Sequence, residues 1–259
     1  MATQETASSI HNKATFPDLE GKVVLVTGAA RGIGKHIAEA FAEQRSKLML
    51  VDLSPAVEAT AGQIAQAYAV EAKHGLADVT DSKQVKTVVE AAITAYGTLD
   101  VLVNNAGITR DKLLLQMSDA DIDAVIDTNL KGALKFTRES IRYLRKSSGV
   151  IINISSIVGI TGNAGQVNYS AAKGGLNSAT LSICREYGKS VRAYSICPGF
   201  IDTDMTAGLP QAIKDAFIAR TPMARPGYPR EVAEAVVACA TLYGNSFKNG
   251  NLIRVTGGM

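Results

Sequence analysis

The sequence predicts an α/β protein in which one doubly wound parallel sheet of about seven strands carries helices on both faces. Short apolar runs, as expected for strands buried on both faces, alternate along the chain with segments of helical periodicity. The 259 residues, 46% of them hydrophobic and 20% charged, fit one such domain over residues 19–259. Glycines or polar residues follow several of the strands, which predicts a ligand-binding crevice at the carboxyl edge of the sheet.

The first half of the chain alternates between the two kinds of segment. A continuous apolar run predicts a buried strand over residues 22–27, and a helical pattern follows over residues 35–44. Further strands are expected at residues 47–51, 74–77 and 99–103, and further helices at residues 55–70 and 81–96.

The second half continues the alternation and adds one irregular segment. Ser118 followed by Asp121 is typical of a helix start, because the serine caps the helix and the acid lies at its third position. Strands are expected at residues 150–154, 191–197 and 251–255, and helices up to about residue 187 and over residues 229–243. Residues 204–226 show only a short helical part, which predicts a lid over the crevice.

Composition argues against several classes of function. A net charge of +3 with both signs interspersed gives no case for binding nucleic acid or membrane, and no apolar run approaches the ~18 residues of a transmembrane helix. The three cysteines and three histidines lack metal-ligand spacing, and the cysteine pattern favours a reducing compartment. We therefore expect a cytoplasmic protein without a metal site. Residues 1–18 are polar, lack the apolar core of a secretory signal and are expected to form a mobile tail.

A glycine motif joins the first predicted strand to the first predicted helix. Gly28 permits a tight turn, while Gly32 and Gly34 let the backbone approach a pyrophosphate at the helix N-terminus, where unpaired N–H groups favour an anion. The spacing is G-x-x-x-G-x-G and differs from the G-x-G-x-x-G of the general dinucleotide motif. The alternative is a tight strand–helix connection that binds no ligand.

Two charged residues bear on which dinucleotide would bind. Asp52 ends the second strand about 20 residues beyond the glycines, where a carboxylate suits the 2′-hydroxyl of an adenosine ribose and repels a 2′-phosphate. Arg31 favours the opposite choice, because a guanidinium in the glycine turn could reach a 2′-phosphate. We expect Asp52 to dominate, which favours NAD(H), with NADP(H) as the runner-up.

Tyr169 and Lys173 are the candidate proton-transfer pair. They are four residues apart in an alanine-rich segment, and on a helix this spacing places both side chains on one face. An ammonium about 4 Å from the phenol would favour the phenolate by roughly 4 kcal/mol at an effective dielectric of about 20. The pKa of Tyr169 is therefore expected to fall toward the range useful for general acid–base catalysis. The alternative is an amphipathic helix with a Tyr–Lys pair on its surface.

Polar residues after two other strands are further candidates. Ser155 and Ser156 follow the strand at residues 150–154, where a hydroxyl would face the crevice. Residues 104–107, Asn-Asn-Ala-Gly, follow the strand at residues 99–103 and suggest a close approach of backbone and ligand. Asn129 lies in a helical stretch, and the pattern alone predicts a solvated surface position for it.

Taken together, these motifs resemble the short-chain dehydrogenase/reductase superfamily over residues 19–259. The matching set is Thr27-Gly28-x-x-x-Gly32-x-Gly34, Asn104-Asn105-Ala106-Gly107, Asn129, Ser156, Tyr169-x-x-x-Lys173 and Pro198-Gly199. Residues 105–111, 163–169 and 198–206 are most similar to the 3-oxoacyl-(acyl-carrier-protein) reductase branch. The resemblance implies a Rossmann-type fold, hydride transfer between a nicotinamide cofactor and a carbonyl or secondary alcohol, and usually a homotetramer.

The resemblance also implies roles for single residues. Tyr169 would give its proton to the carbonyl oxygen, and Ser156 would hydrogen-bond that oxygen. Lys173 would lower the pKa of the tyrosine and bind the nicotinamide ribose, while Asn129 would hold a water of a proton relay. The cofactor would contact Tyr169, Lys173, Asp52 and the adjacent Leu53. Its pyrophosphate would contact Gly28, Ala30, Arg31, Gly32, Ile33 and Gly34, its adenine Asp78 and Val79, and its ribose Asn105, Ala106 and Gly107. It would also contact Pro198, Gly199, Ile201 and Thr203, of which Ile201 and Thr203 would contact the carboxamide.

Some residues depart from the branch or bear on its partner. The branch usually uses NADP, yet Asp52 is acidic. Arg45 stands where the family commonly has glycine, and a left-handed arginine costs on the order of 1 kcal/mol, which predicts a rebuilt turn. An acidic carrier protein would need a basic rim, for which the candidates are Arg142, Arg145, Lys146 and Lys189.

Three functions are compatible with the sequence. The first is NAD(P)(H)-dependent reduction of a 3-oxoacyl thioester carried on acyl carrier protein or CoA. The second is an NAD-dependent dehydrogenase of a steroid, polyol or other small secondary alcohol, and the predicted lid would decide between these two. The third is a nucleotide-binding sensor or scaffold, against which the intact set Asn129, Ser156, Tyr169 and Lys173 argues.

Overall fold

The computed structural model describes residues 14–259, and within this range seven strands form one parallel sheet of order β3-β2-β1-β4-β5-β6-β7. This confirms the predicted sheet. The strands are β1 (Val23–Thr27), β2 (Lys47–Asp52), β3 (Ala72–Leu76), β4 (Val101–Asn104), β5 (Val150–Ile154), β6 (Arg192–Pro198) and β7 (Asn251–Val255). The third strand begins two residues before its predicted start. It is an edge strand without a fully buried residue, so it lacks the apolar run that marks β1.

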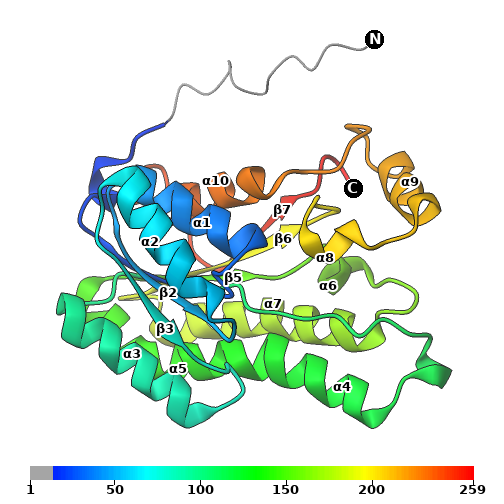
Figure 1. The fold of residues 1–259 in the computed structure, drawn as a ribbon, viewed down its shortest axis with the longest axis horizontal. Coiled ribbons are helices and arrows are strands. Elements are labelled where there is room, and N and C mark those ends of the chain that lie inside the picture. Colours follow the sequence, from blue (N-terminus) through cyan, green and yellow to red (C-terminus); the bar gives the residue numbers. More distant parts are fainter. Residues whose placement is uncertain (1–13) are drawn as a thin grey trace.

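Helices cover both faces of the sheet (Figure 1). One layer contains α1 (Gly32–Glu43), α2 (Ala56–Tyr68) and α10 (Pro229–Ala240), and the other contains α3 (Ser82–Tyr96), α5 (Ala133–Ser147) and α7 (Val167–Tyr187). Successive residues of β1 point to opposite faces, so Val24 and Val26 belong to one buried cluster and Val23 and Leu25 to the other. Both faces of the sheet are therefore buried, as continuous apolar strands require.

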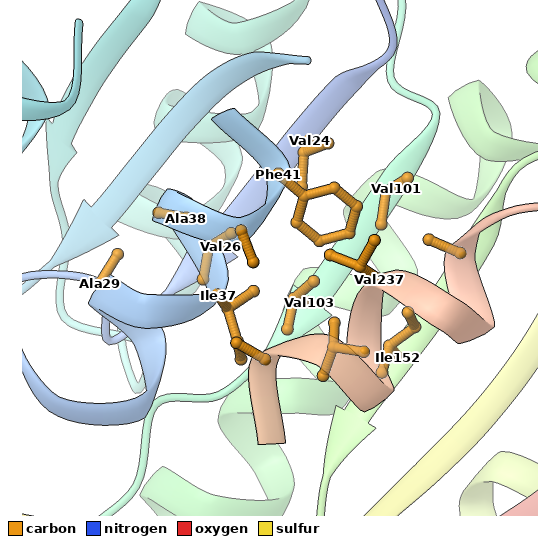
Figure 2. Packing of buried hydrophobic residues seen from close by; sticks show 14 of the residues in the cluster. Val24, Val26, Ala29, Ile37, Ala38, Phe41, Val101, Val103, Ile152 and Val237 are labelled. Atoms are coloured by element: carbon orange, nitrogen blue, oxygen red, sulfur yellow. The ribbon is translucent and has the colours of Figure 1, made fainter. Parts of the chain in front are cut away.

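The packing of α1 and α10 fixes the first helix over the sheet (Figure 2). Ile37 and Phe41 of α1 and Val237 of α10 lie against strand residues that include Val103 and Ile152. Phe41 is fully buried, and truncating such a side chain to alanine costs about 3–5 kcal/mol. This contact therefore holds the N-terminus of α1 at the end of β1.

The helix predicted to start at Ser118 begins there but is interrupted. Ser118 and Asp121 form the expected capping box, and α4 (Asp119–Ile126) follows. The backbone then makes a π-helical turn at Asp127–Gly132 before α5 continues. Such turns widen a helix locally and are frequent at functional sites.

The segment predicted to be a lid contains two short helices. These are α8 (Asp204–Ala207) and α9 (Gln211–Ala219), and neither contains a buried residue. The ring of Phe217 stacks on Phe200, with 5.0 Å between ring centroids and 10° between planes. The remaining short elements are α6 (Val158–Thr161) and the 3-10 turns Pro17–Leu19 and Leu114–Gln116.

The N-terminal end of the described chain is hydrogen-bonded to other parts of the fold. Most of the predicted mobile tail, residues 1–13, lies outside the described residues. Ala14 accepts a hydrogen bond from Gln44, and the Asp18 carboxylate accepts one from Thr241 at 2.6 Å. Among the helices of residues 14–259, none has both the length and the apolarity needed to cross a membrane.

The turn after α1 is not rebuilt. Arg45 adopts a left-handed conformation with φ of 59°, so the expected rearrangement is wrong. Its N–H donates to Ala42, and its carbonyl oxygen accepts from Gly21. The arginine thus occupies a left-handed conformation that glycine adopts more readily and bears a local cost on the order of 1 kcal/mol.

The order of strands reverses direction between β1 and β4. From β1 the chain builds β2 and β3 on one side, and it then returns to add β4 to β7 on the other side. In open parallel sheets, ligands bind at such a reversal, beyond the carboxyl ends of the strands. The predicted site residues follow the carboxyl ends of β1, β2, β4, β5 and β6 or lie on the helices beside them.

Candidate active site

Ser156, Tyr169 and Lys173 come together at the carboxyl end of β5. Ser156 follows the strand, while Tyr169 and Lys173 lie one turn apart on α7. The Lys173 ammonium lies 5.6 Å from the centre of the Tyr169 ring and donates a hydrogen bond of 2.7 Å to the carbonyl oxygen of Ile154. Ser155, the other predicted hydroxyl, donates instead to the carbonyl oxygen of Lys173 at 3.0 Å. Ser155 therefore fastens α7 to β5, and Ser156 is the hydroxyl beside Tyr169.

The pKa values of this pair differ from the prediction. Burial raises the pKa of Tyr169 to about 12, and a hydrogen bond with Ser156 acts in the opposite direction. Burial also lowers the pKa of Lys173 to about 8. The predicted fall in the pKa of Tyr169 is therefore wrong for this structure, because desolvation of the phenol outweighs any effect of the ammonium. At neutral pH the phenol keeps its proton, which is the form that can donate.

Asn129 is buried, so the surface position predicted from its helical pattern is wrong. It lies in the π-helical turn with a side chain only 1% exposed. Its amide binds both backbone groups of Ile108, accepting from the N–H at 2.8 Å and donating to the carbonyl oxygen at 2.9 Å. A Cβ on Gly107 would lie 3.1 Å from Asn129 Oδ1 and 3.6 Å from Lys173 Nζ, so both side chains border the same glycine.

The glycine loop is held in place by the strand beside it. The Asn105 side-chain amide donates to the carbonyl oxygens of Thr27 and Gly28, each at 2.9 Å. Gly28 has φ of 65°, and a Cβ there would lie 2.8 Å from the backbone of Ala106. A Cβ on Gly34 would lie 2.0 Å from the carbonyl oxygen of Gly28. Only glycine fits these two positions without moving backbone atoms.

The glycine loop is open at Gly32. Apart from the adjacent residues and the backbone of α1 itself, no protein atom lies within 4 Å of where a Cβ on Gly32 would stand at the start of α1. Ile33 is the next residue of the first turn, and the N–H groups of this turn have no partner within the helix. A helix N-terminus with open space before it suits a pyrophosphate, so the residues present fit the predicted cofactor.

Asp52 joins the glycine loop to the end of β2. One carboxylate oxygen accepts from the N–H of Ala30 and the other from the N–H of Ser54, both at 2.9 Å. Arg31 is exposed next to Ala30, and Leu53 is 70% exposed. Asp52 and Arg31, the two residues that bear on cofactor choice, thus both lie at the glycine loop, where Arg31 is exposed to solvent.

The predicted adenine and carboxamide residues lie after β3 and β6. The Asp78 carboxylate accepts two hydrogen bonds from Thr80. Val79 packs against Gly132, where an added Cβ would lie 2.7 Å from the Val79 side chain. Pro198 ends β6, and Gly199 donates its N–H to Val255. Thr206 donates to the carbonyl oxygen of Ile201 at 2.8 Å and accepts from the N–H of Thr203 at 3.0 Å.

Two residues that support the site were quoted in the sequence motifs without a role. The hydroxyl of Thr27 accepts from the N–H groups of Asn105 and Ala106, at 3.0 and 3.1 Å. Asn168 is 2% exposed, donates to the carbonyl oxygens of Arg110 and Asp121, and accepts from the N–H of Tyr169. Two signals in the sequence could have found them: Thr27 is a polar residue at the end of an apolar strand, and Asn168 is a polar residue next to the tyrosine.

The basic side chains predicted to rim the site lie at the other edge of the sheet. Arg142, Arg145 and Lys146 are near the C-terminus of α5, which leads into the amino end of β5. Lys189 lies between α7 and the amino end of β6. These positions are at the opposite edge of the sheet from Tyr169, so within one chain they form no rim around the site.

Comparisons with known proteins show the family to which the chain belongs. The family model for short chain dehydrogenases matches residues 22–214. The chain is 41% identical over 243 residues to the 3-oxoacyl-[acyl-carrier-protein] reductase FabG of Thermotoga maritima, with 93% of this chain and 98% of the relative covered. It is 43% identical over 246 residues to FabG of Aquifex aeolicus and 40% over 245 residues to FabG of Vibrio cholerae, at the same coverage. The chain belongs to the short chain dehydrogenase family and is an oxidoreductase that uses a nicotinamide cofactor.

Proposed function

We propose that this protein reduces the 3-oxo group of an acyl thioester to a 3-hydroxy group, with NADH as the reductant. The observation that carries the proposal is the convergence of Ser156, Tyr169 and Lys173 at the crevice beside the glycine loop. The relatives named 3-oxoacyl-[acyl-carrier-protein] reductase, at about 40% identity over nearly the whole chain, support the substrate class.

The protein's part in the reaction is to bind the carbonyl oxygen and to supply a proton. When bound, the nicotinamide supplies the hydride that adds to the carbonyl carbon. Ser156 hydrogen-bonds the carbonyl oxygen, and Tyr169 transfers its phenolic proton to that oxygen as the carbon–oxygen double bond becomes single. The Lys173 ammonium stabilises the phenolate that remains. Asn129 Oδ1 keeps a second lone pair with which it can accept from a water beside Lys173.

We assign NADH rather than NADPH because of Asp52. Its carboxylate is fixed at the end of β2, beside the glycine loop, by two backbone N–H groups. A 2′-phosphate placed there would meet a fixed negative charge, whereas a 2′-hydroxyl could donate to it. Arg31 is exposed on the same side and reduces this repulsion without replacing the acceptor.

Exposed leucines in the segment that is bonded to the loop before α7 support a substrate that carries an acyl chain. Leu113, Leu114 and Leu115 are 60, 61 and 98% exposed, and the preceding residue Lys112 bonds to Gly165 close to the start of α7. Exposed leucines in a row are costly to leave in water and suit contact with an alkyl chain or thioester arm. This observation supports a thioester over a polyol.

Assembly into a homotetramer is part of the proposal. Exposed apolar side chains gather around the edge strand β7 and the segment before it, namely Leu242, Tyr243, Phe247 and Leu252. A large apolar area at a sheet edge favours association with another copy. Light scattering of the purified protein tests this part, and a monomer at micromolar concentration would contradict it.

Initial rates with both reduced cofactors test the function directly. We expect acetoacetyl-CoA to be reduced with a kcat/KM at least about tenfold higher for NADH than for NADPH. The same thioester on acyl carrier protein distinguishes the two carriers. Oxidation of steroids, polyols and simple secondary alcohols with NAD⁺ serves as the comparison. Turnover of alcohols without turnover of the thioester would contradict the substrate class, and cofactor binding without any turnover would contradict the enzyme itself.

A further inference from the structure

A side chain of α2 holds the carbonyl oxygen of Ala30 in the glycine loop. The hydroxyl of Thr60 donates to this oxygen at 2.9 Å, across 30 residues of sequence. Thr60 is 5% exposed and Ala30 is 8% exposed, so the hydrogen bond is shielded from water. Such a bond is costly to lose, because the carbonyl oxygen would stay buried without a partner.

The hydroxyl of Thr60 reaches out of its own helix to make this contact. Four residues form the buried face of α2, and one of them has a polar side chain: Val57, Thr60, Ala61 and Ile64. A threonine in a helix can donate to the carbonyl oxygen four residues earlier, as Thr87 does to Lys83 in α3. Thr60 donates to the glycine loop instead, so a directional bond ties α2 to the loop in addition to apolar packing.

Thr60 and Asp52 together hold Ala30 from both sides. The N–H of Ala30 donates to the Asp52 carboxylate at 2.9 Å, while the carbonyl oxygen of Ala30 accepts from Thr60. The first bond fixes the peptide before Ala30, and the second fixes the peptide after it. The backbone of this residue is therefore held by the end of β2 and by α2 at the same time.

The hydrogen bond from Thr60 also sets the direction of the N–H of Arg31. Residues 14–259 contain no cis peptide bond, and in a trans peptide the C=O and the N–H that follows it point in opposite directions. Because the carbonyl oxygen of Ala30 points toward α2, the N–H of Arg31 points away from α2. Within the described part of the chain this N–H has no acceptor, and the loop is open at the next residue, Gly32. It can therefore donate to a bound ligand.

We propose that Thr60 is a positioning residue of the cofactor site, which holds the peptide between Ala30 and Arg31 so that the N–H of Arg31 meets an acceptor oxygen on the adenosine half of NADH. The proposal rests on the proposed NADH site at the glycine loop. Thr60 needs no contact with the cofactor, because it acts through the backbone of the loop. Without its hydroxyl this peptide can turn, and binding of the cofactor has to order it again.

Cofactor binding measures this role without turnover. Thr60→Val nearly keeps the shape of the side chain and removes its hydroxyl. The Kd for NADH, from fluorescence titration, is expected to rise about three- to tenfold, which corresponds to the net contribution of one hydrogen bond. ADP, which carries the adenosine and two phosphates without the nicotinamide half, should lose affinity by the same factor. Thr60→Ser, which keeps the hydroxyl, should bind both ligands as the wild-type protein does.

Kinetics separate positioning of the loop from a general loss of structure. In Thr60→Val, kcat for acetoacetyl-CoA at saturating NADH should be unchanged, whereas KM for NADH should rise with the Kd. Thr87→Val, which removes a hydroxyl that bonds within α3, is the control and should leave both quantities unchanged. If Thr60→Val does not fold, Thr60→Ala and Thr60→Ser make the same comparison, because these two side chains differ by the hydroxyl oxygen alone.

The outcomes keep this proposal separate from the proposed function. An unchanged Kd for NADH in the variant without the hydroxyl, or a raised Kd that Thr60→Ser shares, overturns the role of Thr60. A rise for NADH that ADP does not show, or a fall in kcat as large as the rise in Kd, overturns it as well. A raised Kd for both ligands, in a protein that does not reduce acetoacetyl-CoA, would instead refute the proposed function and leave the role of Thr60 intact.

Discussion

The cofactor side and the substrate side of the crevice are built in opposite ways. On the cofactor side, hydrogen bonds that Asn105 donates to Thr27 and Gly28, and one that Asp52 accepts from the N–H of Ala30, fix the glycine loop to two neighbouring strands. On the substrate side, α8 and α9 contain no buried residue, and Phe217 of α9 stacks on Phe200. We infer that the protein presents a preformed cofactor site and leaves closure over the substrate to a loosely packed segment.

The largest effect is expected from a methyl group inside the preformed loop. Gly34→Ala would place a Cβ 2.0 Å from the carbonyl oxygen of Gly28, which is backbone and cannot rotate away. We expect a loss of about 1–3 kcal/mol in the free energy of unfolding and at least a hundredfold weaker NADH binding. Urea unfolding and fluorescence titration measure the two quantities. Gly62→Ala in α2, where nothing lies within 4 Å, is the control and should be neutral or slightly stabilising.

The next largest effect is expected on activity and stability when the buried Lys173 is replaced. Lys173→Met is expected to abolish reduction and yet to stabilise the folded chain by about 1–3 kcal/mol at pH 7, since a buried charge is replaced by an apolar side chain. Because burial lowers the pKa of Lys173 to about 8, the unfolded chain binds this proton more tightly than the folded chain. Wild-type stability should therefore rise between pH 8 and 10.5, and this part of the rise should be absent from the variant.

Melting temperatures across that pH range check the lysine prediction. Lys86→Met, at a position whose side chain is 60% exposed, is the matched control and should keep both the activity and the pH slope. A destabilised Lys173→Met variant would show that the hydrogen bond to Ile154 outweighs the cost of burying the ammonium.

A smaller effect is expected from the carboxylate that selects the cofactor. Asp52→Ala removes the negative charge at the ribose position and leaves Arg31 nearby, so the ratio of kcat/KM for NADH to that for NADPH should fall by about tenfold or more. Parallel initial rates with both cofactors measure this ratio. An unchanged ratio would remove the argument for NADH.

The smallest effect is expected on the substrate side. Phe217→Ala removes the stacking on Phe200, which is worth about 0.5–1.5 kcal/mol, so KM for acetoacetyl-CoA should rise a few-fold while the Kd for NADH stays constant. Leu76→Ala, at a 56% exposed side chain of the edge strand β3, is the control. A change in the Kd for NADH as large as that in KM would show that the two sides are not independent.

The contrast between the cofactor side and the substrate side also explains which parts of the structure the sequence could predict. The strands and the glycine loop were predictable because β1 is an unbroken apolar run and because Gly28 and Gly34 occupy positions that exclude a side chain. The segment at residues 204–226 could be predicted as irregular and partly helical, but its two helices show no buried pattern from which a substrate could be derived.

Three corrections depend on the tertiary structure, which local patterns in the sequence do not specify. The burial of Asn129 depends on a π-helical turn and on Ile108, which a helical pattern does not reveal. The raised pKa of Tyr169 depends on how much protein surrounds the phenol, which its spacing from Lys173 does not specify. The basic residues of α5 lie at the opposite edge because the helix leads into the amino end of β5.

Removal of one hydroxyl tests the central claim, that Tyr169 is the proton donor for a carbonyl held beside the cofactor. Tyr169→Phe is compared with Tyr243→Phe, a tyrosine that is 83% exposed, by following NADH oxidation with acetoacetyl-CoA and NADH binding by fluorescence. We predict that Tyr169→Phe lowers kcat by about 10²–10⁴-fold with the Kd for NADH nearly unchanged, and that Tyr243→Phe changes neither. A Tyr169→Phe variant that keeps more than about a tenth of the wild-type kcat would contradict this mechanism.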